Sequence, residues 1–566
     1  MSAGPPAKRQ TLRPWRWREQ KPQLTLLTTL AAIVVASAAY QFRLGVYTDP
    51  LWLMDLCGRL LDGQTAYVDF LENSPPIAIL IYMPPVLAAR LFGSATEPLL
   101  VVYVEILAGA GLAACAWLLR KAGRLADVGW PGALAAAAAL LMLPDYMFGQ
   151  RDHIVLILAL PWLTQIALRA RGLETTRLAE ILVGLAAGPI FAIRPQYALS
   201  FALVLAYLGW RQGFRAAVSF PEVSAAVAAA AASVVVSLYF FPYYLKVMLP
   251  IILDVYVRDS FELSFLFFNP VAVGSVLLLV GLSTWRRQLR SETLAVVALL
   301  AALGDFAGFF EQGKSIAYHC YPCVALLFVA IVTAARNRIA SLEAAALATL
   351  AFLAAVYLLG AYRFETAFWY EHITIVYVCV AVFGIIAFVL TALNFGRERI
   401  PILGLAVAFA GVGFAWWVFH FEWRSEPFFL DEVRALAPNP RVAVVASFGE
   451  LGHPLTSRVH GRWSLSVIAL MITDSVSNIV ANTPLDAAAL AKLEKYKSLE
   501  EARFLADVAK NPPDAVIVDE DWARRNFNSA DFESWLSSNY VRRDFAISIK
   551  YRLPEYFELY VRSKPS

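Results

Sequence analysis

Long apolar stretches separated by short loops rich in arginine and lysine recur along most of this chain. Apolar residues make up 59% of its 566 residues, and only 16% of the residues are charged. So few charged residues cannot cover a soluble surface, and apolar runs of this kind are typical of membrane-spanning helices. The sequence therefore predicts a polytopic integral membrane protein that is mainly α-helical.

The basic loops predict the orientation of the spans, because Lys and Arg concentrate in the short cytoplasmic loops of membrane proteins. After a basic N-terminus at residues 1–22, such clusters occur near residues 120, 169, 211, 286, 336 and 397. If all of them are cytoplasmic, about thirteen spans result. The expected spans are 24–43, 98–119, 131–144, 154–168, 178–193, 196–210, 224–241, 268–284, 293–310, 321–335, 342–360, 373–393 and 401–419.

One further apolar segment, residues 77–92, is expected to lie along the membrane surface. If it crossed the membrane, it would place every later basic cluster outside. The proline pairs at 75–76 and 84–85 interrupt backbone hydrogen bonding and favour a short interfacial element. Residues 44–97 are then an acidic first outer loop within a membrane domain that spans residues 23–419.

The composition becomes more polar after Phe419, where this topology leaves the chain outside the cytoplasm. Short apolar runs at 441–446 and 514–519 predict buried strands, and the pattern at 485–509 predicts a helix. Residues 420–566 are therefore expected to form a small extracytoplasmic α/β domain.

Four polar groups in the predicted outer loops need an explanation, since ionisable side chains near a membrane are costly and often mark functional sites. They are the first loop with Asp49, Asp55, Asp69 and Glu72, and the segments 144–153, 193–197 and 311–319. The alternative for each side chain is an ordinary interfacial charge or a helix-end partner. The topology places all four groups at one membrane face.

Acids of the first loop are thus expected to meet cations of the later loops. The candidate cations are Arg151, Arg194, Lys314 and His319. Arg and Lys can absorb the charge of a phosphate leaving group, and a carboxylate can take the proton of an acceptor hydroxyl. The combination favours group transfer from a phosphate-linked donor.

Other chemistries find little support in the sequence. There is no phosphate-binding loop, dinucleotide fingerprint or zinc-ligand spacing, so neither a nucleotide-fuelled reaction nor a nucleic-acid partner is expected. The carboxylates could hold a divalent metal, although no diagnostic ligand spacing occurs. The five cysteines do not form a disulfide framework, and Cys320 and Cys323 are expected to pack as small apolar residues.

The order of these motifs resembles the GT-C superfamily of membrane glycosyltransferases. The likeness covers mainly residues 24–330, and its layout is similar to that of protein mannosyltransferases and bacterial aminoarabinose transferases. It rests on Asp49 after the first span, LLDGQTAYVD at 60–69, the Pro-Pro-led segment ending LFG at 91–93, GQRDH at 149–153, and QGKSIAYH at 312–319.

The resemblance implies a polyprenyl-phosphate-linked sugar as the donor, an inverting reaction and a site in the bacterial plasma membrane. Asp49 matches the family's catalytic base, although Pro50 follows it where the protein mannosyltransferases have Glu. Some relatives use a divalent metal and others do not. The acceptor is a lipid, a polysaccharide or a protein.

The same resemblance suggests roles for the other polar residues. The donor phosphate would be held by Lys314 and Arg151, with His319 and Arg194 as further candidates. The sugar or acceptor would be oriented by Asp69, Asp152, Gln312 and Tyr318.

Two other functions remain open. An O-antigen ligase or polymerase also uses lipid-linked glycans, but typically has a long mid-chain outer loop, which the segment 242–267 fits poorly. A lipid or sugar transporter should show two related halves, and the sequence contains no such duplication.

Overall fold

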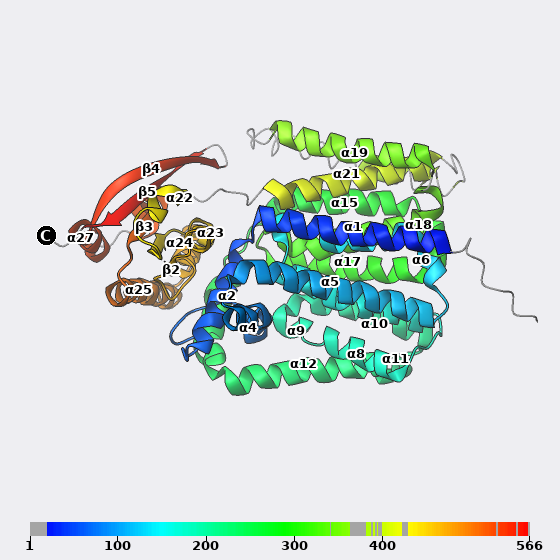
Figure 1. Ribbon diagram of the computed structural model, residues 1–566, viewed down its shortest axis with the longest axis horizontal. Coiled ribbons are helices and arrows are strands. Elements are labelled where there is room, and N and C mark those ends of the chain that lie inside the picture. Colours follow the sequence, from blue (N-terminus) through cyan, green and yellow to red (C-terminus); the bar gives the residue numbers. More distant parts are fainter. Residues whose placement is uncertain are drawn as a thin grey trace, which may run out of the picture.

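The computed structural model consists of a bundle of long helices with a smaller α/β domain beyond one end of the bundle (Figure 1). It describes residues 20–339, 341–362, 381–386, 389–390, 393, 399–421, 428–527, 530–550 and 553–563. The helical bundle and the small C-terminal sheet agree with the expected fold class.

The bundle is built from helices that follow the apolar runs of the sequence. Its longer helices are α1 (Gln20–Leu44), α5 (Thr96–Lys121), α6 (Leu125–Leu141), α7 (Arg151–Ala170), α10 (Ala198–Gln212), α12 (Pro221–Phe240), α15 (Pro270–Ser283), α17 (Thr293–Gln312), α18 (Tyr321–Ile339), α19 (Leu342–Tyr362) and α21 (Arg399–Phe421). Shorter helices between them are α8 (Arg177–Ala187), α9 (Ile190–Ile193), α11 (Phe214–Ser219), α13 (Leu249–Ile251), α14 (Leu263–Phe268) and α16 (Arg286–Ser291).

Within the described residues, six helices are long and apolar enough to cross a membrane, and the number is seven if the bent pair α1 and α2 counts as one span. Four further apolar helices are shorter. The structure thus supports a polytopic membrane protein, and the expected number of thirteen spans stays a prediction. Most of the expected span 373–393 lies outside the described residues.

The expected first outer loop contains a helix of its own. The chain turns by 81° between α1 and α2 (Thr48–Leu61). Gly45, at φ +89°, supplies the left-handed backbone that ends α1. The segment after α2 forms two short helices, α3 (Pro76–Leu80) and α4 (Met83–Phe92), and each begins with a proline in its first turn.

Helices α15 and α21 pack backbone against backbone through facing glycines. A Cβ atom added at Gly411 would lie 2.4 Å from the carbonyl oxygen of Gly274, and one added at Gly281 would lie 2.3 Å from that of Gly404. Small residues that allow close helix contact are a common packing device in membranes, where the hydrophobic effect does not drive helices together.

The C-terminal domain is a five-stranded sheet with helices around it. Its order is β2-β1-β3-β5-β4, with β1 parallel to β2 and β3, and β5 antiparallel to β3 and β4. The strands are β1 (Arg441–Val445), β2 (Arg462–Trp463), β3 (Ala515–Asp519), β4 (Tyr540–Lys550) and β5 (Leu553–Arg562). The helices are α22 (Leu430–Arg434), α23 (His453–Arg458), α24 (Met471–Asn482), α25 (Ala487–Lys510), α26 (Glu520–Asn526) and α27 (Ala530–Asn539). The predicted strands 441–446 and 514–519 and the helix 485–509 correspond to β1, β3 and α25.

Contacts from several parts of the bundle hold this domain, and two of them border the site described below. The first is the segment around α2, where the backbone N–H of Leu71 donates to the carbonyl of Ser466 at 2.9 Å. The second is the irregular segment 244–259, which includes the π-helical turns η4 (Tyr244–Met248) and η5 (Ile252–Tyr256). There Asp254 accepts a hydrogen bond from Tyr496 at 3.0 Å and pairs with Lys492 at 2.5 Å.

Replacing Gly411 with Ala is expected to destabilise the bundle. The new methyl group forces α15 and α21 apart, and overpacking of this kind costs about 1–3 kcal/mol. The thermal unfolding midpoint of the detergent-solubilised protein should fall. Gly109→Ala is the matched control, since a Cβ there meets no atom within 4 Å, and an equal fall in both variants would contradict the close contact.

Candidate active site

Asp49 is the centre of a polar cluster at the end of the bundle that faces the C-terminal domain. Its Oδ2 accepts hydrogen bonds from Arg151 Nη2 at 2.8 Å and from the Tyr318 hydroxyl at 3.0 Å. The Arg151 side chain is 9% exposed and that of Asp49 is 21% exposed. Within the described part of the chain, Asp49 Oδ1 makes no hydrogen bond.

Breaks in the helices bring these side chains together. Asp49 lies in the first turn of α2, where a carboxylate complements the helix dipole. Arg151 is the first residue of α7 and follows Gly149, which has φ +80°. Tyr318 lies in the short 3₁₀ helix η6 (Ala317–Cys320), so three separate helix beginnings meet at one point.

A second ion pair lies deeper in the cluster. Arg194 Nη2 is 3.2 Å from Asp152 Oδ2, and the Tyr197 hydroxyl donates to Asp152 Oδ1 at 2.5 Å. Asp152 is fully buried. Arg194 has extended backbone geometry between α9 and the 3₁₀ turn η3 (Pro195–Tyr197), as expected of a residue that precedes a proline. Its guanidinium lies 5.7 Å from the ring centre of Tyr318, which joins this pair to the Asp49 group.

Lys314 supplies a third cation. It follows Gly313, whose left-handed backbone ends α17. Lys314 Nζ donates to the backbone carbonyl of Asp259, lies 3.8 Å from Asp259 Oδ2, and is 4.0 Å from the ring centre of Tyr256. Burial lowers the pKa of Lys314 to about 8, because the charged form loses hydration, and Asp259 offsets only part of this effect.

Several buried polar atoms of the cluster lack a hydrogen-bond partner among the described residues. They are Nε of Arg151, Nε and Nη2 of Arg194, Oδ2 of Asp152 and both ring nitrogens of His319. His319 is 4% exposed and packs edge-on against Tyr318, with ring centres 4.6 Å apart. Unsatisfied buried donors cost free energy, and a ligand rich in oxygen acceptors would satisfy them. This arrangement favours an anion such as phosphate.

The loop after α2 supports Arg151 from the other side. Arg151 Nη1 donates to Ser74 Oγ, and the Ser74 N–H donates to Glu72 Oε1 at 2.8 Å. Glu72 Oε2 also accepts the indole N–H of Trp52 at 2.6 Å. Both terminal nitrogens of Arg151 are therefore used, which fixes the guanidinium against Asp49.

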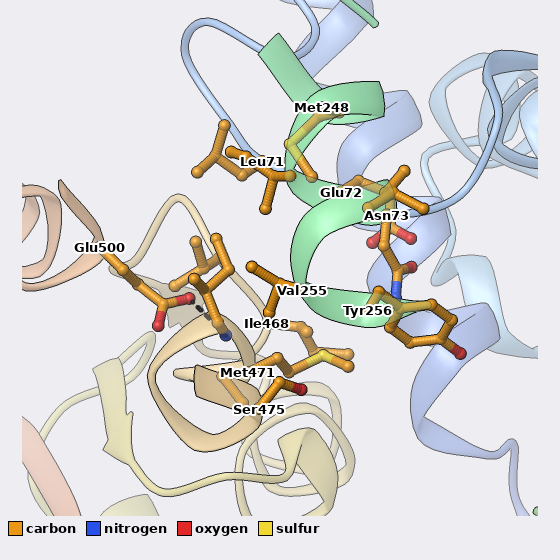
Figure 2. Close-up of a pocket in the computed structure, with 15 residues that line it drawn as sticks. Leu71, Glu72, Asn73, Met248, Val255, Tyr256, Ile468, Met471, Ser475 and Glu500 are labelled. Carbon is orange, nitrogen blue, oxygen red and sulfur yellow. Dashed lines mark hydrogen bonds between the residues drawn. The ribbon is translucent and has the colours of Figure 1, made fainter. Parts of the chain in front are cut away.

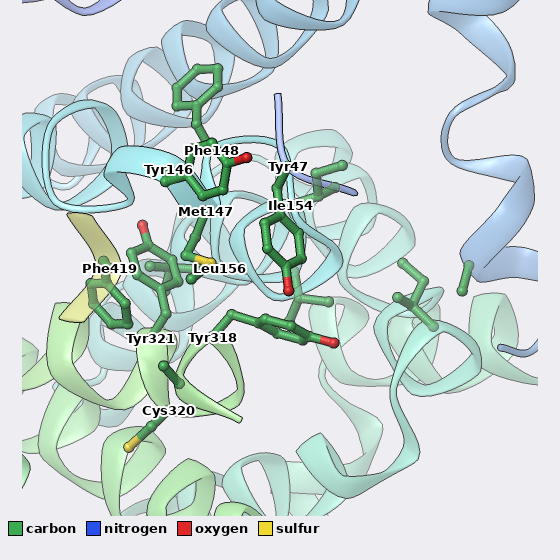
Figure 3. Close-up of a cluster of buried hydrophobic side chains, with 14 of the residues drawn as sticks. Tyr47, Tyr146, Met147, Phe148, Ile154, Leu156, Tyr318, Cys320, Tyr321 and Phe419 are labelled. Atoms are coloured by element: carbon green, nitrogen blue, oxygen red, sulfur yellow. The ribbon is translucent and has the colours of Figure 1, made fainter. Parts of the chain in front are cut away.

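Figure 3 shows a cluster of buried hydrophobic side chains that includes Tyr318, the hydrogen-bond partner of Asp49. The Tyr47 ring contacts the rings of Tyr318 and Tyr146, with centres 6.0 Å and 5.5 Å apart. Tyr321 lies further along and contacts Phe419 of α21 at 5.7 Å. Because these rings are buried and interlocked, they hold the backbone of Asp49 and Tyr318 in place.

The expected site residues are only partly brought together. Asp49, Arg151, Asp152, Arg194, Lys314, Tyr318 and His319 form the cluster described above. Gln312 ends α17 beside it, with a buried Oε1 that has no partner among the described residues. Asp69 is exposed and accepts a hydrogen bond from the N–H of Thr65 in its own turn at 2.6 Å, and no described contact joins it to Asp49.

Sequence reasoning missed the contributions of Ser74, Tyr256 and Asp259. Ser74 is a neutral residue beside a proline pair, and the charged segment 254–259 carries no sequence signal beyond its place in a mid-chain loop. No group of three or more His, Cys, Asp or Glu side chains that could hold a metal ion occurs in the described part of the chain. Asp49, the expected base, is already bonded to Arg151 and Tyr318.

Comparison with known proteins reveals similarity in structure but not in sequence. No family model and no curated protein sequence matches the chain. The structure is similar to ArnT from Cupriavidus metallidurans, both bound to undecaprenyl phosphate (TM-score 0.51) and in the apo state (0.53). The identity is 14% in both cases, and the matches cover 95% and 96% of this chain and 97% and 98% of ArnT.

An oligosaccharyltransferase from Archaeoglobus fulgidus, tethered to an acceptor peptide, is a more distant match. It has a TM-score of 0.39 and 12% identity, and the match covers 95% of this chain and 74% of that protein. ArnT is an aminoarabinose transferase of the GT-C type. The chain thus shares the overall fold of ArnT, in agreement with the resemblance stated above.

Loss of the Arg194 charge is expected to destabilise the protein through Asp152. Removing one partner of a buried ion pair leaves an uncompensated charge and costs about 3–5 kcal/mol. The variant Arg194→Met should therefore unfold at a lower temperature than the double variant Arg194→Met/Asp152→Asn. Arg434→Met, which breaks an exposed pair with Asp431, is the control and should leave the midpoint unchanged. If the single and the double variant lower the unfolding midpoint equally, the uncompensated charge of Asp152 does not cause the loss of stability.

Proposed function

We propose that this protein is an inverting glycosyltransferase that moves a sugar from a polyprenyl-phosphate donor to a hydroxyl acceptor at the outer face of a bacterial plasma membrane. The observation that carries this proposal is the asymmetry around Asp49. One carboxylate oxygen is held by Arg151 and Tyr318, the other is free of hydrogen bonds among the described residues, and buried cationic donors without acceptors lie beside it.

Asp49 is the general base in this proposal. Its Oδ2 is fixed by two donors, so Oδ1 points in one direction and can accept the proton of an acceptor hydroxyl. Arg151 uses both Nη atoms on Asp49 and Ser74. We therefore assign it mainly to orienting the base, with only its buried Nε directed to the donor phosphate.

The donor phosphate is held by Lys314, Arg194 and His319. Lys314 is bound to Asp259 through a backbone carbonyl and a long 3.8 Å ion pair, which makes it the cation that can most readily change partners. Arg194 and His319 contribute the unpartnered nitrogens. Fixed positive groups stabilise the charge that develops on a leaving phosphate.

The reaction is a single displacement. The acceptor oxygen forms a bond to the anomeric carbon on the face opposite the phosphate, and its proton passes to Asp49. The bond between the anomeric carbon and the phosphate oxygen breaks, and the electron pair leaves with polyprenyl phosphate. One carboxylate suffices, because phosphate departs without protonation, unlike the leaving group in glycoside hydrolysis.

Orientation of the sugar is assigned to neighbouring polar residues. Tyr318 and Gln312 border the cluster, and Asp152 positions Arg194. Asp69 is assigned to orienting the acceptor alone. The turn that contains it contacts the C-terminal domain, because the carbonyl of Val68 accepts a hydrogen bond from Arg503. No step of this mechanism passes through a metal ion.

The fold supports this function over that of a transporter. The similarity to ArnT extends over 95% of the chain and includes the C-terminal domain, whereas a transporter would be expected to show two related halves. ArnT was solved with undecaprenyl phosphate, and we propose the same class of lipid carrier for this chain.

Asp49→Asn is expected to abolish sugar transfer while the protein still binds its donor. An amide cannot take the acceptor's proton, and loss of general base catalysis costs on the order of 10²–10⁴-fold in rate. Transfer from a panel of radiolabelled polyprenyl-phosphate sugars would be measured in membranes, with product counted in the lipid, polysaccharide and protein fractions. Asp62→Asn, an exposed acid at the other end of α2, should retain activity. Full transfer by Asp49→Asn would remove Asp49 as the base.

Binding of undecaprenyl phosphate is expected to weaken as pH rises through about 8, the pKa of Lys314. The protonated amine binds the anion, and each further pH unit removes most of the remaining charged form. The affinity should fall about tenfold between pH 7 and pH 9. A phosphate monoester is already largely ionised at pH 7, so its own titration contributes little.

Lys314→Arg is the control for this titration, because a guanidinium stays charged over the whole range. Binding by that variant should not change between pH 7 and pH 9. If the affinity of the wild-type protein is also unchanged between pH 7 and pH 9, Lys314 is not the titrating phosphate ligand.

A further inference from the structure

The loop that carries Lys314 has an unusual backbone. It runs over residues 313–316, between α17 and the 3₁₀ helix η6. Gly313 and Ser315, on either side of Lys314, both have left-handed backbone geometry, with φ +66° and +52°. Glycine adopts this conformation readily, whereas a serine residue is strained there and keeps it only when its surroundings hold it. A contact from elsewhere in the fold must therefore fix Ser315.

The side chain of Asn269 supplies this contact. Its Nδ2 donates hydrogen bonds to the backbone carbonyl of Ser315 at 2.7 Å and to Ser315 Oγ at 3.2 Å. Asn269 is 7% exposed, so water competes little for these bonds. Their loss would leave polar groups of the loop without a partner, which is unfavourable in a buried environment.

The oxygen of the same amide caps a helix. Asn269 is the N-cap of α15, and its Oδ1 accepts the backbone N–H of Val271 at 2.9 Å. Asn, Asp and Ser are about equally good in this role. An ionised aspartate has no donor, however, and serine offers a single short-armed oxygen. Only the amide gives an acceptor to the cap and donors to the loop at the same time.

Helix α15 makes a rigid base for this contact. Its backbone approaches that of α21 at Gly274, where an added Cβ atom would lie 2.6 Å from the carbonyl oxygen of Gly411. Gly274 lies roughly one and a half turns after Asn269. Val271 and Ala272, between them, are fully buried. The start of α15 cannot shift without disturbing this packing, so Asn269 holds the loop at a fixed place in the bundle.

The partners of the Lys314 amine lie on the other side of the loop, in the irregular segment. Nζ donates to the carbonyl of Asp259 and lies 3.8 Å from its Oδ2 and 4.0 Å from the ring centre of Tyr256. Tyr256 and Ser475, which donates to Asp259, border a cavity between this segment and the C-terminal domain (Figure 2). Side chains beside a cavity have fewer packing partners than those of α15. The amine can therefore exchange Asp259 for a phosphate while the backbone of the loop stays fixed.

We propose that Asn269 is a positioning residue, which holds Ser315 in its left-handed conformation and so presents Lys314 to the donor phosphate. The inference rests on the proposed function, in which Lys314 binds that phosphate. A side chain that is fixed in place before its ligand arrives loses less entropy on binding. Asn269 acts through the loop and is assigned no contact with donor or acceptor.

The variant Asn269→Ser tests this role, because serine retains a cap for α15 and loses both bonds to Ser315. Asn482→Ser is the matched control. Asn482 is an exposed asparagine at the end of α24, and its Nδ2 donates to the carbonyl of Asn478 in the same helix. The control should leave each of the following measurements unchanged.

Hydrogen exchange of the detergent-solubilised protein, followed by mass spectrometry, reports directly on the loop. The amide of Phe261 donates to Gly313, and the amide of His319 donates to Ile316. Loss of two hydrogen bonds in Asn269→Ser should raise the exchange of these amides about tenfold, since local opening becomes more frequent. Exchange at the wild-type rate would overturn the proposal.

The pH dependence of undecaprenyl phosphate binding is a second readout, which a role in capping alone would not change. Burial lowers the pKa of Lys314 to about 8, and Asp259, Tyr256 and His319 face the same amine. When the loop is released, the amine gains water and its pKa rises toward the ordinary 10.5. At pH 7, Asn269→Ser should bind about tenfold more weakly than wild type, because fewer molecules hold the loop in place.

Between pH 7 and pH 9 the affinity of Asn269→Ser should stay constant, because its amine remains charged. The wild-type affinity falls over this range, so the two proteins should bind almost equally at pH 9. A variant that shows the same fall as wild type would contradict the positioning of Lys314 by Asn269.

A second substitution, Ser315→Gly, separates the loop from a general loss of stability. Glycine takes the left-handed conformation without strain. In the Asn269→Ser background it should therefore restore part of the affinity at pH 7. A double variant that binds no better than Asn269→Ser would show that the backbone at position 315 is not what Asn269 holds.

Failure of the proposed function would look different. Wild-type binding that does not depend on pH would remove Lys314 as the phosphate ligand, and with it the role of Asn269 in presenting that ligand. A protein that transfers no sugar from any donor would contradict the glycosyltransferase assignment. Hydrogen exchange requires neither donor nor turnover, so it decides independently whether Asn269 holds the loop.

Discussion

The ion pair between Asp49 and Arg151 is the interaction on which the organisation of the site depends. Both side chains are largely withdrawn from water, and a buried charge without a partner is strongly unfavourable. The pair therefore requires the beginnings of α2 and α7 to lie side by side. The 81° turn after α1 makes this arrangement attainable, since a straight continuation would carry Asp49 away from the bundle.

Each cation of the cluster has its own carboxylate, and the pairs differ in how tightly they are held. The distances are 2.8 Å for Arg151 and Asp49, 3.2 Å for Arg194 and Asp152, and 3.8 Å for Lys314 and Asp259. Within each of these three pairs the charges balance without a ligand. Buried nitrogens of Arg151, Arg194 and His319 nevertheless stay unsatisfied within the described structure, which costs stability and favours an incoming anion. Real proteins often depart from full polar satisfaction at functional sites.

The C-terminal domain is part of the same system. Its Glu450 accepts a hydrogen bond from Tyr47 at 3.2 Å, two residues before Asp49, and its Ser475 binds Asp259 beside Lys314. The C-terminal domain thus contacts both Tyr47, close to the proposed base, and Asp259, the partner of the proposed phosphate ligand Lys314. Hydrogen bonds and apolar contacts therefore act together at this interface.

Hydropathy and charge position act locally along the chain. For this reason the membrane class, the helical runs, the polar C-terminal region and most charged members of the cluster could be predicted from the amino-acid sequence. Asp49, Arg151, Arg194 and Lys314 could be named because ionisable residues next to apolar helices are costly. Which of these residues form pairs became visible only in the folded protein. Ser74, Tyr256 and Asp259 joined the site and Asp69 remained apart from it, because contacts between residues distant in sequence depend on where helices break and turn, and no local pattern records those distances.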